Sequence, residues 1–116
     1  MPRDSLDLMK GTLDVLVLKT LSWGPMHGYG VSRWIRQRTR GELEVEDAAL
    51  YQALHRLESR GWLEAEWGRS ENNRRAKFYV VTERGREQLR DQTRAVRRYV
   101  RALALVLDAR GSGVAS

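Results

Sequence analysis

The sequence has no cysteine, only two prolines and a single phenylalanine among its 116 residues. Without cysteine the chain forms neither disulfides nor thiolate metal sites. Its longest apolar run, Ala102 to Leu107, is far shorter than the about 20 residues that a membrane-spanning helix needs. The start, Met1-Pro2-Arg3-Asp4, lacks the basic-then-apolar pattern of a signal peptide. We therefore expect a cytoplasmic protein that does not enter the membrane.

Lysine is also scarce, since all but Lys10, Lys19 and Lys77 of the 21 basic residues are arginine. Together with 15 acidic residues they give a net charge of +6. A basic excess favours a polyanionic partner but indicates no fold. The length fits one domain. The high charged fraction of 31% suits a helical protein with a large solvated surface, or one that hides its remaining apolar stripe in a partner.

A first helix is predicted from a cap at Asp4 or Ser5 to the residues before Trp23-Gly24-Pro25. It must stop there because a proline disfavours the α conformation of the residue before it. Mostly apolar residues recur at helical spacing on one face, which we expect to be buried. They are Leu6, Met9, Leu13, Leu16, Val17, Thr20 and Leu21.

Two further helices follow. The second is expected from Gly28 to about residue 40, and His27 before it is expected to orient the turn. Its inward-facing residues are predicted to be Tyr29, Val31, Trp34 and Ile35. The third helix is expected from residue 48 to about 60, with Glu46 or Asp47 as cap and Gly61 as its end.

A hairpin and a long helix complete the chain. Residues 62–67 alternate apolar and polar side chains, which is typical of a strand. Residues 78–81, rich in aromatic and β-branched side chains, are predicted to be the returning strand, with the hairpin tip at 68–76. Thr82 then caps a helix that extends to about Leu107.

Three helices followed by a two-stranded hairpin are the element order of a winged helix-turn-helix. The predicted fold class is therefore mainly α with a small β-hairpin, plus a long C-terminal dimerisation helix. We expect a DNA-binding domain at 1–81, the dimerisation helix at 82–110 and a disordered tail at 111–116.

The third helix presents two contrasting faces. Leu50, Ala53, Leu54 and Leu57 share the core side. The opposite side is compact, polar and nearly uncharged, and it comprises Ala48, Gln52, His55 and Ser59, with Tyr51 and Arg56 on its flanks. Such a face suits base edges in a major groove, with glutamine matched to adenine. An ordinary solvated face has the same pattern. Tyr51 fits a half-buried ring or a phosphate contact equally well.

The hairpin tip is basic. Residues 69–77 hold four positive side chains and one negative, between Trp67 and Phe78. Such a tip can follow the DNA backbone or enter the minor groove, and its phosphate contacts make binding salt-dependent. The alternative is a solvated turn that arginine keeps soluble. The candidate DNA-binding residues here are Arg69, Asn73, Arg74, Arg75 and Lys77.

Several blocks of the sequence resemble the PadR family of bacterial regulators, in the short form with one C-terminal helix. The blocks are residues 24–31 (GPMHGYGV), 50–63 (LYQALHRLESRGWL), 65–67 (AEW), 72–79 (NNRRAKFY) and 81–85 (VTERG). The resemblance covers roughly residues 6–100. It departs at Gln52, where the family usually has proline, and at Ala48-Ala49, where it has Gly-Ser or Gly-Thr. Both departures concern the operator sequence and not the fold.

The resemblance implies a homodimer that binds a near-palindromic double-stranded DNA operator and represses transcription. Some relatives release DNA when phenolics or drugs bind between the domains, so it also allows for a small-molecule effector of unknown identity. Tyr99 is the only aromatic residue of the long helix, which argues against an aromatic effector at the dimer interface.

The fourth helix carries a seam at a/d-like spacing, with Thr93 in the one missing position. The predicted dimerisation residues are Leu89, Val96, Val100, Leu103 and Leu107. The alternative is that the seam packs on its own domain, and the apolar stripe of the first helix could pair with it in either protomer. The many arginines of this helix are interpreted as a solvated or inter-subunit face.

Enzyme chemistry finds no support in the sequence. His27 and His55 are the only histidines and have no metal-ligand spacing. No phosphate-binding loop or nucleophile elbow is present, so we expect no cofactor, no metal and no catalytic residue. Trp23, Trp34, Trp62 and Trp67 are interpreted as core and hairpin anchors. A winged-helix interaction module whose arginine-rich helix binds an acidic partner stays open as the second hypothesis.

Overall fold

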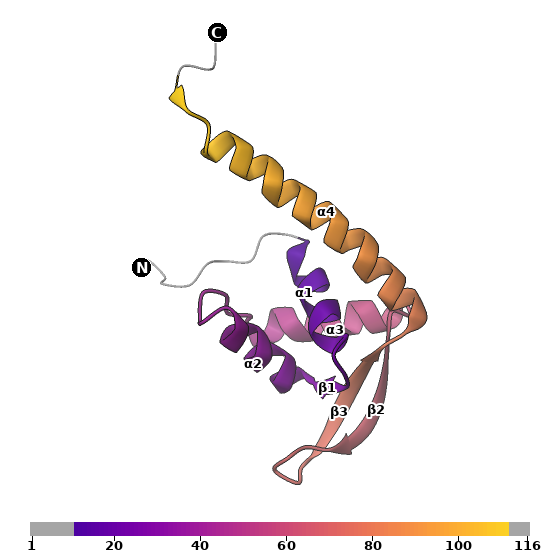
Figure 1. The fold of residues 1–116 in the computed structure, drawn as a ribbon. Helices are drawn as coiled ribbons and strands as arrows, with labels where there is room; N and C mark the ends of the chain where they lie inside the picture. The colour runs from indigo at the N-terminus through magenta and orange to yellow at the C-terminus, as the bar shows by residue number, and fades with distance from the viewer. Residues whose placement is uncertain (1–10, 112–116) are drawn as a thin grey trace.

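The computed structural model describes residues 11–111, and Figure 1 shows their arrangement. The elements are α1 (Thr12–Leu21), β1 (Met26–His27), α2 (Gly28–Arg38), α3 (Asp47–Ser59), β2 (Leu63–Arg69), β3 (Arg75–Val81) and α4 (Glu83–Leu107). The predicted order of helices and hairpin is confirmed. The predicted first helix does not run unbroken from residue 4 or 5, because Gly11 has φ 89° and α1 begins at Thr12. The predicted cap at Asp4 or Ser5, the inward-facing Leu6 and Met9, and the tail at 112–116 lie outside the described residues.

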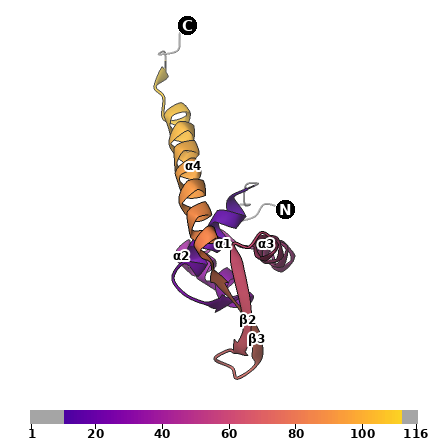
Figure 2. The same ribbon diagram turned by 90° about the vertical axis from the view of Figure 1, so that its right-hand side faces the viewer.

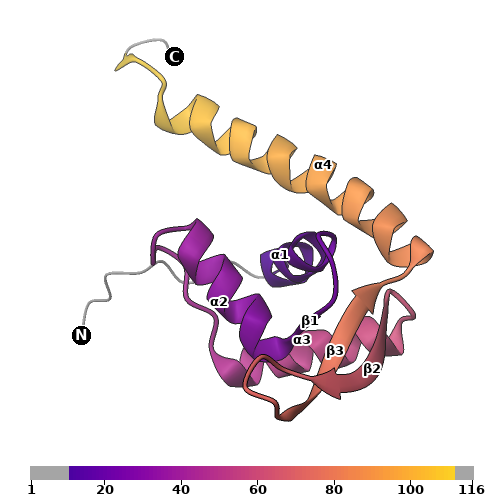
Figure 3. The ribbon, with the colours of Figure 1, turned by 60° about the horizontal axis from the view of Figure 1, so that its bottom comes forward.

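The core lies between the first three helices and the sheet. The predicted inner sides of α1 and α3 are confirmed, and Val15 and Leu18 of α1 are buried as well. Figure 3 shows α1 between α4 and the other two helices, so that both of its sides are covered. This double covering explains why α1 buries more residues than one helical stripe predicts. The core side chains are Val17, Leu18, Leu21, Val31, Ile35, Leu50, Ala53, Leu54, Leu57, Leu63, Tyr79 and Val81.

The inner side of α2 was predicted only in part. Val31 and Ile35 are buried, and Trp34 packs partly against the core. The prediction for Tyr29 is wrong, because its side chain is 63% exposed. Tyr29 lies on the helix side opposite Val31 and Ile35, and only the latter side meets the core.

The sheet has three antiparallel strands in the order β1-β3-β2. The two-residue strand β1 pairs Met26 with Tyr79 and was not predicted, since two residues are too short to show an alternating pattern. The hairpin ladder extends to the pair Arg69–Arg75. The tip predicted at 68–76 is therefore too long, and the turn is confined to residues 70–74. The ladder continues into solvent because its hydrogen bonds are made by the backbone and need no apolar side chain.

Two helix ends are built as predicted. Gly61 has φ 79°, and the backbone N–H groups of Gly61 and Trp62 donate to the carbonyls of Glu58 and Leu57, which closes α3 in a Schellman motif. At the start of α4, the Thr82 hydroxyl accepts from the N–H of Gly85 at 3.0 Å. At the start of α3, Glu46 is the capping residue but makes no side-chain cap hydrogen bond.

The long helix α4 begins in close contact with Trp62, the residue before β2. A Cβ atom at Gly85 would collide with the carbonyl oxygen of Trp62, so glycine permits the close contact between α4 and the start of β2. From there α4 passes α1 and then extends away, on the side of the molecule opposite the hairpin (Figures 1 and 2). Among residues 11–111, no helix combines the length and the apolar character needed to cross a membrane.

Candidate nucleic-acid interface

The outer face of α3 is exposed to solvent. Ala48, Gln52, His55 and Ser59 are all exposed, as predicted for a reading face. Within the described part of the chain, the polar side chains among them make no hydrogen bond and no ion pair. The opposite side of the helix is fully buried and fixes its orientation. A rigid helix with unengaged donors and acceptors is what direct base readout requires.

Tyr51 has the half-buried ring that one of the two sequence alternatives predicts. Its ring lies over the start of α2, because a Cβ atom at Gly28 would stand 2.8 Å from the Tyr51 hydroxyl oxygen. About half of its side chain is nonetheless exposed. Glycine at position 28 thus allows α2 and α3 to approach closely at the Tyr51 ring.

Arg56 has an intramolecular partner that the sequence did not reveal. Its guanidinium donates to both carboxylate oxygens of Asp14 in α1, from Nε at 3.3 Å and from Nη2 at 2.5 Å. The Asp14 hydrogen bond raises the pKa of Arg56 above its ordinary value. Arg60 reaches the same carboxylate at 3.9 Å. The pair joins residues 42 positions apart, so no local pattern could have indicated it.

The wing, defined here as β2, β3 and the turn between them, is braced by its own residues. Arg69 donates from Nη1 to the carbonyl of Asn73 at 3.2 Å, and the N–H of Asn73 donates to the carbonyl of Ser70 at 2.8 Å. Asn73 has φ 60°, a left-handed conformation that asparagine tolerates better than most residues. Arg69 and Asn73, both predicted DNA contacts, therefore also shape the turn.

The remaining wing cations differ in their surroundings. Arg74 is exposed, and Arg75 lies over the ring of Trp67 at 4.5 Å from its centroid. Lys77 instead donates to Glu58 of α3 at 3.2 Å, and this bond raises the pKa of Lys77. Arg69, Arg74 and Arg75 are thus the wing cations that form no ion pair within the described residues, and of these Arg69 is bonded to the Asn73 carbonyl.

Two of the four tryptophans are not anchors. Trp34 and Trp62 pack against the core as predicted, but Trp67 is 59% exposed and Trp23 is 65% exposed. Trp67 lies in the part of β2 that extends beyond the core, so its ring meets Arg75 instead of apolar neighbours. Trp23 lies in the turn after α1, where Lys19 contacts its ring.

An open groove joins these elements. Its lining comes from α2, α3 and the wing, and includes Tyr29, Arg33, Tyr51, Trp67, Arg74 and Arg75. Tyr29 and Arg33 were not predicted here. Their spacing of four residues, offset from Val31 and Ile35, places both on the outer side of α2 and could have indicated them.

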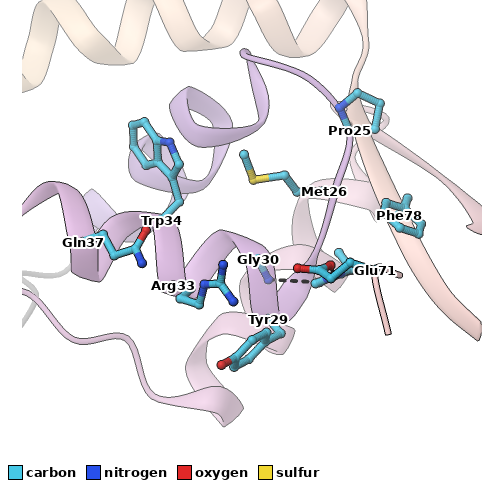
Figure 4. A pocket seen from close by; sticks show the side chains of 10 residues that line it. Pro25, Met26, Tyr29, Gly30, Arg33, Trp34, Gln37, Glu71 and Phe78 are labelled. Atoms are coloured by element: carbon cyan, nitrogen blue, oxygen red, sulfur yellow. Dashed lines mark hydrogen bonds and ion pairs between the residues drawn. The ribbon is translucent and has the colours of Figure 1, made fainter. Parts of the chain in front are cut away.

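His27 connects the start of α2 with the wing. Its Nδ1 accepts a hydrogen bond from the N–H of Gly30 at 3.0 Å, so the predicted structural role is confirmed (dashed line in Figure 4). Its Nε2 lies 3.6 Å from a carboxylate oxygen of Glu71 in the wing turn. In residues 11–111, no three histidine or acidic side chains come together as a metal site would require.

The predicted dimer seam of α4 divides into two parts. Leu89 and Val96 border a groove whose other wall is Val15 and Leu16 of α1 in the same chain. The later seam residues Val100, Leu103 and Leu107 are exposed. Leu89 packs partly against the core of its own chain, whereas the end of the seam is uncovered in this single chain.

Three helices, an antiparallel wing and an exposed polar face on the third helix define a winged helix-turn-helix protein. Residues 17–91 match the Transcriptional regulator PadR-like family. The chain belongs to this family, which consists of DNA-binding transcriptional regulators and not of enzymes.

Individual relatives agree with this assignment. A transcriptional regulator from Clostridium thermocellum is 26% identical, with a TM-score of 0.74 over 81% of this chain and 91% of that one. A PadR family transcriptional regulator from Eggerthella lenta is 28% identical, with a TM-score of 0.72 over 87% and 86%. An uncharacterized protein from Lysinibacillus sphaericus is 30% identical over 72% of this chain and 76% of its own length.

Proposed function

We propose that this chain is a repressor that binds a near-palindromic operator as a homodimer, with α3 in the major groove and the wing on the phosphate backbone. The observation that carries the proposal is the pairing of an unengaged, uncharged face on α3 with free arginines on the adjoining wing. The first can read bases and the second can hold phosphates. Repression itself rests on resemblance to the family.

The residues take different roles in this proposal. Gln52 and His55 read base edges, with Ala48 and Ser59 allowing close approach, and the Tyr51 hydroxyl donates to a phosphate. Arg74 and Arg75 hold the backbone, and Arg69 and Asn73 keep the turn that presents them. Arg56 and Lys77 are each paired with a carboxylate, that of Asp14 and that of Glu58. Their first role is therefore to link α3 to α1 and the wing to α3.

The second copy would cover the exposed end of the α4 seam. Val100, Leu103 and Leu107 lie on one side of a helix that extends away from its own domain. Burial against a partner helix would remove this apolar surface from water. In this arrangement 1–81 is the DNA-binding part and 82–110 the dimerisation part. The protein acts in the cytoplasm, where a bacterial chromosome is accessible.

The test is a gel shift on the DNA upstream of the protein's own gene, with unrelated competitor DNA, followed by footprinting. We expect saturable nanomolar binding, a preference of at least about 1,000-fold over competitor, and two protected half-sites about 34 Å or a multiple of that apart. Transcription from that promoter in vitro should fall when the protein is added. Equal affinity for operator and competitor would refute the proposal and favour the interaction module.

A further inference from the structure

One cation beside the groove has no role in the proposed contacts. Arg33 of α2 is exposed, and its guanidinium lies 5.7 Å from the ring centroid of Tyr29 on the same outer side of the helix. Among the described residues it makes no ion pair. Both residues line the same groove as Arg74 and Arg75 of the wing. A DNA strand held by the wing at this groove would therefore also come close to Arg33.

The same groove is also lined by a carboxylate side chain, that of Glu71. Glu71 is the one acidic residue of the wing turn, its side chain is 69% exposed, and it stands beside His27 at the start of α2. Figure 4 shows Glu71, Arg33 and Tyr29 around one opening. The pKa of Glu71 is lowered first by its own backbone amide, then by the His27 imidazole, with a further contribution from the charge of Arg33. Like any exposed glutamate, Glu71 carries a negative charge at neutral pH.

A carboxylate at this place opposes phosphate binding. Phosphate and carboxylate carry the same sign of charge, and both are attracted by the cations around the groove. A strand that binds Arg33 must therefore displace the carboxylate or tolerate it as a close like charge. Removal of the carboxylate should consequently favour binding, and the gain should depend on Arg33.

We propose that Arg33 and Tyr29 form a second phosphate contact on α2, and that Glu71, which stands beside His27 in the same groove, opposes the binding of a DNA phosphate there. The inference rests on the proposed DNA binding. It adds a contact that the α3 and wing residues do not supply, and it makes Glu71 a residue that restrains binding to every sequence. Glu71 acts through position and charge, and reads no base.

The experiment is a double-mutant cycle of Arg33→Ala and Glu71→Gln on an operator duplex and an unrelated duplex of equal length, from about 50 to 200 mM salt. Arg33→Ala should weaken binding to both duplexes about tenfold and lower the salt slope by about one. Glu71→Gln should strengthen binding to both about threefold. The double variant should bind like Arg33→Ala, because the gain at position 71 requires the arginine.

Matched controls separate this contact from general charge effects. Arg36→Ala removes the same charge from an exposed position of α2 near Glu44, and Glu66→Gln removes a carboxylate from an exposed position of β2. Each should change affinity by less than about twofold. Arg33→Lys, which keeps the charge, should restore most of the salt slope. Thermal unfolding of each variant checks that the fold is retained.

Three results would overturn the inference. One is an unchanged salt slope in Arg33→Ala, and another is an effect of Arg36→Ala equal to that of Arg33→Ala. The third is a Glu71→Gln gain that persists without Arg33, which would make Glu71 a distant charge only. In each of these three cases the wild-type protein would still prefer its operator over the unrelated duplex. If the wild-type protein showed no such preference, the proposed function itself would be refuted.

Discussion

The outer face of α3 and the wing are fixed in opposite ways. The α3 helix is held from behind by fully buried leucines, and the side chains of Gln52, His55 and Ser59 on its outer face have no partner within the described residues. The wing extends beyond the core, and its outer part is held by its own residues, with Arg69 bonded to Asn73 and Arg75 stacked on Trp67. Base reading needs unengaged groups on a rigid support, whereas phosphate contact needs exposed charge on a shaped ribbon.

The largest expected effect comes from the wing. Arg74→Ala combined with Arg75→Ala should weaken binding to operator and unrelated duplexes alike about 100-fold, and should lower the salt slope by about two. Gel shifts at several salt concentrations measure both. The control is Arg98→Ala with Arg101→Ala, which removes the same charge from exposed positions of α4. An α4 effect larger than the wing effect would contradict the comparison and favour an acidic partner of α4.

The close contact between Gly28 of α2 and Tyr51 of α3 can be tested by a larger residue at position 28. Gly28→Ala places a methyl group against the Tyr51 ring, and such overpacking should lower the free energy of unfolding by about 1 to 3 kcal/mol. Thermal or denaturant unfolding measures it. Gly30→Ala is the control, because its nearest neighbour would be 3.4 Å away, an ordinary contact. Equal destabilisation by both changes would show that Tyr51 does not set the approach of α2 and α3.

Base reading should respond to Gln52. Gln52→Ala should change the preference at one base pair of each half-site about tenfold, and should leave the salt slope unchanged because no charge is lost. Binding to a set of operators with single substitutions measures this effect. Gln37→Ala on α2 provides the comparison with the same side chain elsewhere. A uniform loss on all sequences would make Gln52 a backbone contact.

The smallest effect is expected where the two regions meet. Glu58→Gln removes the carboxylate that holds Lys77. Because the pair is partly exposed, stability should fall by less than about 1 kcal/mol. The salt slope should rise, since the freed lysine can reach a phosphate. A fall of the slope would indicate that Glu58 positions Lys77 for its contact.

Features that a local rule decides agree between sequence and structure. The inner side of α3 follows from helical periodicity, and Thr82 and Gly61 follow from the chemistry of helix ends. The predicted burial is wrong where it depends on residues that are close in space but distant in sequence. Tyr29 looked like a core residue because α2 could not be oriented without the sheet, and Trp67 looked like an anchor because the length of the ladder beyond the core was unknown.

The candidate site shows the same division. Each residue of the α3 face and of the wing could be named from pattern and charge, as could the family resemblance. The partners Asp14 of Arg56 and Glu58 of Lys77, and the groove that adds Arg33, depend on segments far apart in the chain. No sequence window contains both partners of such a contact.

By itself, the sequence determined the order of the helices and hairpin, the two sides of α3, the caps of α4 and α3, and the basic wing turn, because periodicity, capping and charge are properties of neighbouring residues. Only the tertiary structure decided which cations remain free. Arg56 and Lys77 are paired with carboxylates, whereas Arg74, Arg75 and Arg33 face the open groove. The physical reason is that a charge is engaged or available according to what lies within a few ångströms of it, and folding sets those distances.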